Sequence, residues 1–195
     1  VSSSGIVDTS ALMRSYLGDI EDKGGMISYN TCFKQADIDN NLFKILVSQN
    51  HEEIEINSRI LINATGIYAE DNANNLLFLD KSNIPKTFYA KGNYFETGKK
   101  LGIKHLIYPV PNEASLGLHL GLDMGMTVRF GPDVEWVDEI SYEVDKNREE
   151  IFYNDIIKYI PSFDRSMLKP GYSGIRPKLK GKGQGKSDWM IQSQK

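Results

Sequence analysis

The feature that most constrains the fold is a succession of short β-prone runs between residues 87 and 136. They read TFYAKGNYFET, HLIYPVP, LGLHLGLD and TVRFG, and Gly, Pro or Asn stands at the joints between them. Apolar and polar side chains alternate along strands with one buried face, and closely spaced turn residues favour strands that reverse direction. This part of the chain therefore predicts a largely antiparallel sheet.

The first 80 residues predict a different arrangement. Apolar residues recur at helical spacing from Asp8 to Lys23, and Gly24-Gly25 ends this helix. Three β-prone runs follow, MISYNTCF, NLFKILVS and SRILINATG, with polar turns between them. The third run is continuously apolar, as in a strand covered on both faces, and YAEDNANNLLFLD then predicts a short helix.

The residues after the sheet predict one more helix and a strand. REEIFYNDIIKYI carries its isoleucines on one side, and Pro161 ends it. GYSGIRPKLKGKGQGKSDWMIQ predicts a strand, a basic glycine loop and another short strand. The predicted fold class is α+β: a largely antiparallel sheet with flanking helices, plus part of an α/β domain.

Composition narrows the classes of function. A chain of 195 residues with 40% hydrophobic content can bury a core, and its net charge of −3 gives no electrostatic reason to bind nucleic acid or an anionic membrane. Cys32 is the single cysteine, which excludes an internal disulfide and predicts a cytoplasmic protein. No apolar run approaches the length of a membrane span, so no transmembrane segment is predicted.

Three histidines are candidate proton acceptors near neutral pH. His51 lies in a polar turn and is predicted to face solvent, and His105 precedes a predicted strand. His119 lies inside LGLHLGLD, where Leu118 and Leu120 point to the opposite face, so its ring faces either solvent or a ligand cavity. No two histidines have ligand spacing, and no metal site is predicted.

Two arginines and two carboxylates are candidates for ligand binding. Arg176 stands in GIRP, where its planar guanidinium can hold a carboxylate through two parallel hydrogen bonds or form a surface ion pair. Arg129 in TVRFG is either a ligand contact or, on the strand alternation, simply exposed. Asp133 and Glu135 in RFGPDVEW form either a carboxylate pair or part of an ordinary turn.

Two glycine-containing segments offer backbone to a ligand. ILINATG delivers an apolar run into a small-residue turn, which suits close approach of a ligand but also describes an ordinary buried strand and turn. Residues 181–186 have glycines at the wrong spacing for a phosphate loop, which favours a solvated loop over a phosphate cradle. No GxGxxG motif follows a predicted strand.

Seven short motifs occur along the chain in an order and at spacings that are typical of one protein family. They are SGIVD at 4–8, INATGIYA at 62–69, KGNYF at 91–95, LIYPVP at 106–111, GLHLGLD at 117–123, RFGPDVEWV at 129–137 and GIRPKL at 174–179. Together they resemble the FAD-dependent L-2-hydroxyglutarate dehydrogenases and oxidases, within the D-amino-acid oxidase and glycerol-3-phosphate dehydrogenase superfamily. RFGPDVEW and LIYPVP are close to family-specific, whereas an Asn-Ala-Thr-Gly turn occurs in many flavoproteins.

The resemblance implies a domain plan. Residues 1–80 correspond to a partial FAD-binding domain, 81–170 to a substrate-binding antiparallel sheet domain, and 171–195 to a segment returning towards the FAD domain. It also implies an internal fragment, because the family's N-terminal dinucleotide-binding motif and C-terminal end do not appear. We therefore expect FAD in the complete enzyme, weak or absent FAD binding by this chain alone, and either self-association or a complementing N-terminal half.

The resemblance further implies oxidation of L-2-hydroxyglutarate to 2-oxoglutarate, with hydride passing to the flavin and the hydroxyl proton to a base. On this basis His119 is the expected proton acceptor and Arg176 the expected anchor of a dicarboxylate substrate. The other substrate-binding candidates are Lys91, Tyr94, Tyr108 and Arg129, and the cofactor-binding candidates are Ala64, Thr65, Gly66, Gly174 and Ile175. The alternatives are a related flavoenzyme acting on glycerol-3-phosphate or an amino acid, and a non-catalytic remnant or split-enzyme half that acts as an interaction module.

Overall fold

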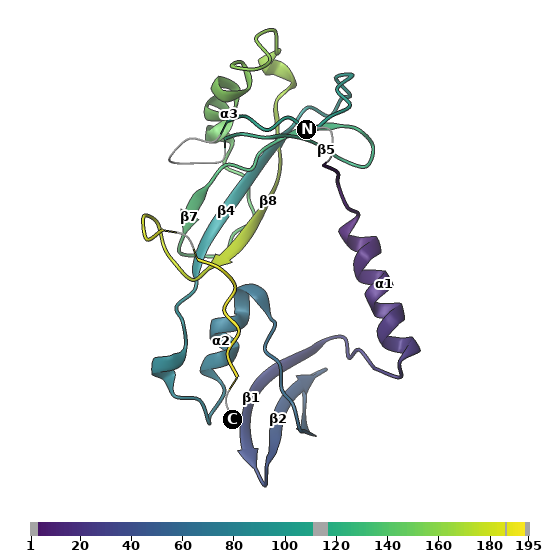
Figure 1. The fold of residues 1–195 in the computed structure, drawn as a ribbon, viewed down its shortest axis with the longest axis vertical. Coiled ribbons are helices and arrows are strands. Elements are labelled where there is room, and N and C mark those ends of the chain that lie inside the picture. The colour runs from purple at the N-terminus through teal and green to yellow at the C-terminus, as the bar shows by residue number, and fades with distance from the viewer. Residues whose placement is uncertain (1–3, 111–116, 186, 194–195) are drawn as a thin grey trace. The chain divides into compact units, whose positions relative to one another are not determined.

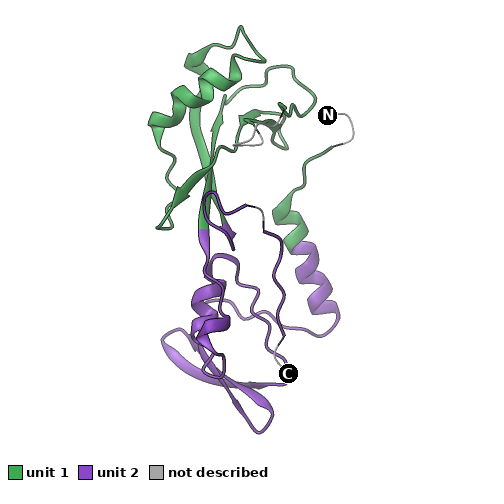
Figure 2. Ribbon diagram, turned by 60° about the vertical axis from the view of Figure 1, so that its left-hand side comes forward, with its two compact units in different colours: residues 1–13, 89–176 green, residues 14–88, 177–195 purple. Residues whose placement is uncertain are grey.

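The structure is a computed structural model that describes residues 4–110, 117–185 and 187–193 (Figure 1). The chain divides into two compact units (Figure 2). Unit 1 comprises Val1–Met13 and Tyr89–Arg176, and unit 2 comprises Arg14–Phe88 and Pro177–Lys195. Within the described ranges, no helix has the length and apolar character needed to cross a membrane.

Unit 1 contains the predicted antiparallel sheet. Its strands are β4 (Phe88–Glu96), β5 (Leu120–Leu122), β6 (Val128–Phe130), β7 (Glu135–Val137) and β8 (Lys169–Lys178). They lie in the order β5-β6-β4-β7, and β8 pairs with β4. The β5–β6, β4–β6 and β4–β7 pairs are antiparallel, which confirms the prediction from the sequence.

The prediction that HLIYPVP forms an extended strand is wrong. Only Ile107 bridges to the sheet, through an antiparallel pairing with Leu120. Pro109 has no N–H group with which to continue a ladder, so the pairing stops after one bridge. The last residue of this run lies outside the described ranges.

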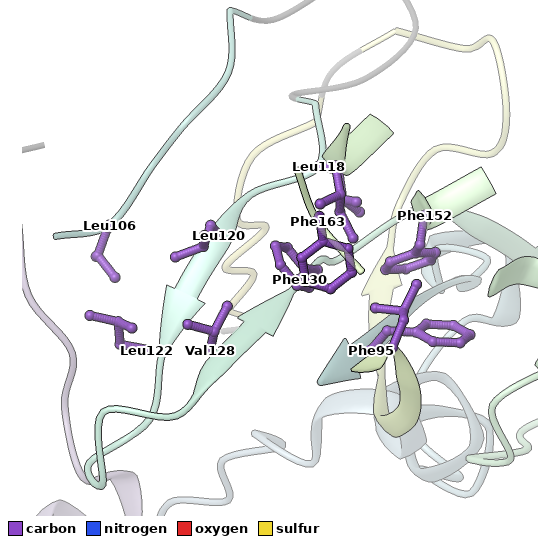
Figure 3. Close-up of a cluster of buried hydrophobic side chains, with 11 residues drawn as sticks. Phe95, Leu106, Leu118, Leu120, Leu122, Val128, Phe130, Phe152 and Phe163 are labelled. Atoms are coloured by element: carbon purple, nitrogen blue, oxygen red, sulfur yellow. The ribbon is translucent and has the colours of Figure 1, made fainter. Parts of the chain in front are cut away.

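One face of this sheet carries the core of unit 1. Figure 3 shows Leu120 and Leu122 of β5 beside Val128 and Phe130 of β6. Helix α3 (Glu149–Ile156) adds Phe152, whose ring centroid lies 4.5 Å from that of Phe95. Full burial of each such side chain contributes about 1.5–3 kcal/mol. The 3₁₀ turns η3 (Lys146–Arg148) and η4 (Arg165–Met167) flank α3 in the chain.

The carboxylates of RFGPDVEW have structural partners. Asp133 Oδ1 accepts hydrogen bonds from the Asn93 backbone N at 2.8 Å and from its Nδ2 at 3.1 Å. Glu135 Oε2 accepts from Asn93 Nδ2 at 3.0 Å, and Arg148 Nε donates to the other Asp133 oxygen. This network, which includes the fully buried Asn93, joins β4 to the segment before β7 and to η3. The structure therefore favours an architectural role for both carboxylates.

Helix α1 (Thr9–Asp22) forms where the sequence predicts it. Asp8 Oδ1 accepts from the Ala11 backbone N at 2.9 Å, which satisfies one of the free N–H groups at the start of the helix. At the other end, Gly24 has a φ of +77° and Gly25 N donates to the Ile20 carbonyl at 2.8 Å, as in a glycine-terminated helix.

Unit 2 contains an antiparallel three-stranded sheet. Its strands β1 (Thr31–Asp39), β2 (Leu42–Gln49) and β3 (Glu52–Ser58) follow one another in chain order. The two-residue turns between them, at residues 40–41 and 50–51, have positive φ at both positions, as twisted hairpins require. The β2 prediction is confirmed, and β1 begins five residues later than the predicted run.

The predicted strand over SRILINATG is wrong. Strand β3 ends at Ser58, and Ile60 and Ile62 are 72% and 78% exposed. The tight turn after β2 instead pairs the alternating EEIEINS segment with β2. Hairpin register thus decided which residues became the strand, because a continuously apolar run forms a buried strand only where other elements cover it.

The predicted helix after this run is confirmed in part. The 3₁₀ turn η1 (Gly66–Tyr68) leads into α2 (Ala69–Asn74), and η2 (Lys81–Asn83) follows. A small core of Ala36, Ile45 and Val47 lies beneath this region. The basic glycine loop closes on itself through hydrogen bonds between Gly181 and Gln184, and the short strand predicted after it does not form within residues 187–193.

Candidate functional site

Polar side chains lie on the face of the unit 1 sheet opposite its apolar core. On β4, Phe95 is fully buried whereas Tyr94 and Glu96 are partly exposed. On β6, Arg129 lies between the fully buried Val128 and Phe130 and is directly opposite Glu96 in the ladder. Strand alternation therefore places Tyr94, Glu96 and Arg129 on one face, which we call the polar face.

Arg129 is held loosely on the polar face. Its Nη2 lies 3.5 Å from Asp123 Oδ2, and its Nε lies 4.0 Å from Glu96 Oε2. The side chain is 35% exposed, yet its buried Nε has no hydrogen-bond partner among the described residues. A guanidinium carries five N–H donors, so Arg129 retains capacity for an additional acceptor such as a ligand carboxylate.

Asp123 is the more firmly ordered of the two carboxylates. Its Oδ1 accepts hydrogen bonds from the backbone N–H groups of Thr127 and Gly125, each at 2.8 Å. These bonds, led by that from Thr127 and assisted by Arg129, hold the pKa of Asp123 below its usual value. Asp123 is therefore a permanent anion near neutral pH.

A pair of stacked tyrosines forms the centre of the polar face. The Tyr94 and Tyr172 ring centroids are 4.5 Å apart, with only 9° between the ring planes. Burial raises the pKa of the Tyr94 phenol, and Tyr172 adds to the rise, while Arg176 and Arg129 act in the opposite direction. Tyr94 is thus a neutral hydroxyl within electrostatic range of both arginines.

Arg176 is the unpaired cation of this site. It lies on β8 and is exposed, and it makes no hydrogen bond or ion pair with another residue that the structure describes. Tyr172, four residues earlier on the same strand, shares its face. Gly174 lies between them, and a Cβ there would meet no atom within 4 Å, so the sheet surface beside Arg176 is open.

His119 and Tyr108 extend the polar face at β5. Leu118 and Leu120 are 5% and 0% exposed, which confirms that His119 points away from the core. The rings of Tyr108 and His119 stack, with centroids 4.3 Å apart and planes 28° apart. The stack orients the imidazole, and the role of His119 as proton acceptor stays a prediction.

Lys91 does not lie on the polar face with the other candidate residues. It is 6% exposed, lies with Asn93 on the core side of β4, and donates from Nζ to the Glu143 carbonyl. Strand alternation separates it from Tyr94, three positions later. The structure thus joins five of the six predicted catalytic and substrate-binding residues on one face: Tyr94, Tyr108, His119, Arg129 and Arg176.

The predicted cofactor turn lies in unit 2. Ala64, Thr65 and Gly66 are exposed, and Gly66 has a φ of +61°. The Thr65 hydroxyl donates to Asn63 Oδ1 at 2.7 Å and accepts from Asn72 Nδ2 at 3.0 Å, so the side chain of the turn is committed internally. The Thr65 backbone is also engaged, since its N–H donates to Asn63 Oδ1 at 3.4 Å and its carbonyl accepts from Tyr68 N at 3.2 Å, and the approach of this turn to a cofactor stays a prediction.

Three residues of the polar face were missed in the sequence: Glu96, Asp123 and Tyr172. Period-two alternation along KGNYFE and GYSGIR carries the signal for two of them, because Glu96 shares a face with Tyr94 and Tyr172 with Arg176. The same alternation along LHLGLD puts Asp123 on the face of His119, whereas its ion pair with Arg129 depends on the β5–β6 pairing.

Comparison with known proteins decides the family. Residues 1–190 match the family described as FAD dependent oxidoreductase. The chain belongs to this family. The chain is also 31% identical, over 230 aligned residues, to the mitochondrial L-2-hydroxyglutarate dehydrogenase of Arabidopsis thaliana, which confirms the resemblance found in the sequence. That alignment covers 98% of this chain and 48% of the relative, so the chain spans about half the length of this relative.

Solved flavoenzyme structures share the fold of this family member. A dithionite-reduced L-α-glycerophosphate oxidase from Mycoplasma pneumoniae with FAD bound has a TM-score of 0.67 and 18% identity, covering 81% of this chain and 41% of that one. A glycine oxidase from Bacillus cereus has a TM-score of 0.62 and 13% identity, covering 86% and 43%. At these identities the likeness concerns the fold.

The turn at residues 64–66 is compatible with contact to part of an FAD molecule. The exposed turn at residues 64–66, with its positive-φ glycine, suits a close backbone contact. The cavity beside it measures about 50 Å³ and cannot enclose a flavin; it is lined by Phe33, Leu61, Asn63, Thr65, Asn72 and Leu76. The described residues around the turn thus form no site that encloses a flavin, and a contact of the turn with the cofactor stays a prediction.

Proposed function

We propose that the polar face of unit 1 binds the substrate of an FAD-dependent oxidoreductase that oxidises a 2-hydroxy acid, L-2-hydroxyglutarate, to 2-oxoglutarate. The observation that carries this proposal is the position of Arg129 and Arg176 on one sheet face, both within electrostatic range of Tyr94. The 31% identity to an L-2-hydroxyglutarate dehydrogenase supports the choice of substrate.

A dicarboxylate needs two strongly donating anchors. Arg176 is exposed and free of ion pairs within the described chain, so it is the first anchor. Arg129 has ion pairs of 3.5 and 4.0 Å, both longer than hydrogen bonds, and its Nε has no hydrogen-bond partner among the described residues. It is the second anchor, with the Tyr94 hydroxyl as a neutral donor between the two.

His119 accepts the hydroxyl proton in this proposal. An imidazole nitrogen takes the proton as the C2 alcohol becomes a ketone, and Tyr108 holds the ring in orientation through the stack. Bound FAD supplies the acceptor for the hydride. The arginines hold both carboxylates, so that the C2 hydroxyl is presented in one orientation.

Residues 1–80 and 171–195 supply the cofactor side of the proposal. Residues 1–80 belong to a partial FAD-binding domain in which Ala64, Thr65 and Gly66 approach the cofactor through backbone. Residues 81–170 form the substrate domain, and residues 171–195, with Gly174 and Ile175, return towards the cofactor. The FAD-dependent family and the exposed turn support this assignment.

A complementing half or self-association covers the exposed apolar surface of unit 2. Ile60 and Ile62 are largely exposed, and no residue of α1 is buried in the described part of the chain. Apolar surface of this kind favours association.

We place the protein in the cytoplasm, because a single exposed cysteine, Cys32, suits a reducing compartment. The Arabidopsis relative is named as mitochondrial, and cell fractionation decides between the two compartments.

Anaerobic flavin reduction tests the proposed reaction. The full chain is reconstituted with FAD, alone and with the complementing half, and mixed with L-2-hydroxyglutarate. We expect bleaching of the flavin band only in the complemented protein, and about ten- to a hundredfold slower bleaching in Arg176→Ala, since a charged pair to a carboxylate is worth about 1.5–3 kcal/mol. Arg165→Ala, which removes an exposed arginine paired with Glu149, is the matched control. Unchanged bleaching by Arg176→Ala would reject the proposed anchor.

An amino acid is the second candidate substrate. Glu96 and Asp123 add two negative charges to the polar face against the single charge of Arg129, which suits an ammonium group beside a carboxylate held by Arg176. Flavin bleaching by glycine and not by L-2-hydroxyglutarate would favour this candidate.

A further inference from the structure

Tyr172 connects the two sides of the polar face. Its ring stacks on Tyr94 of β4, and the Arg129 guanidinium carbon of β6 lies 5.2 Å from its ring centroid. Tyr172 itself belongs to β8, which also carries Arg176. A single exposed ring thus contacts residues of two other strands on the face that we propose binds the substrate.

The Tyr172 ring is a further constraint on Arg129, besides its two carboxylates. The ion pairs with Asp123 and Glu96, at 3.5 and 4.0 Å, are too long to fix the guanidinium as hydrogen bonds would. A cation over an aromatic face is attracted by the negative potential of the ring. Contact with Tyr172 therefore limits where the long Arg129 side chain can move.

The Tyr94 stack fixes the ring in turn. The rings are nearly parallel, with 9° between their planes, so Tyr172 has little freedom to swing away from Arg129. Because Tyr172 and Arg176 share a strand and a face, the ring also relates the position of Arg129 to that of Arg176.

We propose that Tyr172 is a positioning residue for dicarboxylate recognition: its ring holds Arg129 at a fixed place relative to Arg176, so that two guanidiniums meet the two carboxylates of one ligand. This inference rests on the proposed function. It predicts that loss of the ring weakens binding of a dicarboxylate and leaves binding of a monocarboxylate unchanged.

Calorimetric titration of the full chain with glutarate and butyrate tests the ligand side. In Tyr172→Leu we expect the Kd for glutarate to rise about fivefold, the factor that corresponds to a cation–π contact, with the Kd for butyrate within about twofold. Tyr172→Phe keeps the ring and should bind both acids as the wild type does. Tyr142→Leu, at a similarly exposed tyrosine of unit 1, is the matched control. Equal glutarate affinity in Tyr172→Leu and Tyr142→Leu would overturn the proposal.

A second measurement is independent of ligand binding. In chain labelled with ¹⁵N-arginine, the Arg129 Nε–H signal is identified by its loss in Arg129→Lys. We expect this signal to shift and to exchange faster with water in Tyr172→Leu, and to stay in place in Tyr172→Phe. An unchanged signal in Tyr172→Leu would overturn the positioning role. If glutarate fails to bind the wild type, the dicarboxylate function falls, and the NMR signal still decides whether Tyr172 holds Arg129.

Discussion

At the scale of single residues, the chain uses its carboxylates in two ways. Asp133 and Glu135 lie among structural partners, where they accept hydrogen bonds from the buried Asn93. Asp123 and Glu96 lie on the polar face and pair loosely with Arg129. Sequence context alone did not separate these roles, because RFGPDVEW suits both a carboxylate pair and a turn.

Asp133→Ala should destabilise unit 1 by about 2–4 kcal/mol, because it leaves the Asn93 backbone N–H and Arg148 Nε without their acceptor, while Asn93 Nδ2 keeps Glu135. Urea unfolding followed by circular dichroism measures the free energy of unfolding. Asp138→Ala, at an exposed aspartate of the same unit, is the control and should change it by less than about 0.5 kcal/mol. A similar small change in both variants would contradict the network described for Asn93.

The Asp123 carboxyl should make stability depend on pH in acid. Its folded-state pKa is lowered from the usual 3.8, first by the Thr127 N–H, so its contribution is complete above that value and is lost as the pH falls through the folded-state pKa. Urea unfolding at pH 6 and pH 3 should therefore show a smaller loss of stability in Asp123→Asn than in the wild type. An equal loss in both proteins would mean that Asp123 contributes nothing to the acid response.

At the scale of elements, strand alternation was the most reliable guide. It predicted the orientation of His119 and Arg129, because each lies between two apolar neighbours that the core buries. The strand predicted over SRILINATG rests on continuous apolar content instead, and it is wrong because hairpin register places β3 earlier, on the alternating EEIEINS segment. The Tyr94–Tyr172 stack joins residues far apart in the chain, so no local pattern predicts it.

Gly92 tests how closely the segment after β6 packs on β4. A Cβ at this position would lie 2.7 Å from Pro132 Cβ, so Gly92→Ala should destabilise unit 1 by about 1–3 kcal/mol. Gly174→Ala adds its Cβ to open space and should change the free energy of unfolding by less than about 0.5 kcal/mol. Thermal or urea unfolding of the two variants compares them directly, and equal stability would show that the strand yields to the added methyl group.

Helix α1 should exchange its amide hydrogens faster than β4 or α3. None of its residues is buried within the described chain, and a 14-residue helix without tertiary packing is marginal in water. Hydrogen exchange followed by mass spectrometry measures this. Strong protection of residues 9–22 would instead show that an associated chain covers the helix.

At the scale of the whole molecule, the chain is a member of the FAD-dependent oxidoreductase family that carries a well-packed sheet unit and a unit with much apolar surface exposed. The sequence motifs predicted the family and the antiparallel sheet of unit 1. The arrangement of the polar face required the structure, since its members come from β4, β6, β8 and the segments around β5. Contacts between distant strands follow from pairing and register, which a single sequence expresses only weakly.

The most direct test of the central claim is a calorimetric titration of 2-oxoglutarate into the full chain and into Arg176→Ala, Arg129→Ala and the control Arg165→Ala. We predict binding by the wild type and the control, with affinity reduced about tenfold or more in each polar-face variant, as expected when a charged hydrogen-bonding partner of a carboxylate is removed. Unchanged affinity in both polar-face variants would contradict the assignment of this face as the dicarboxylate site.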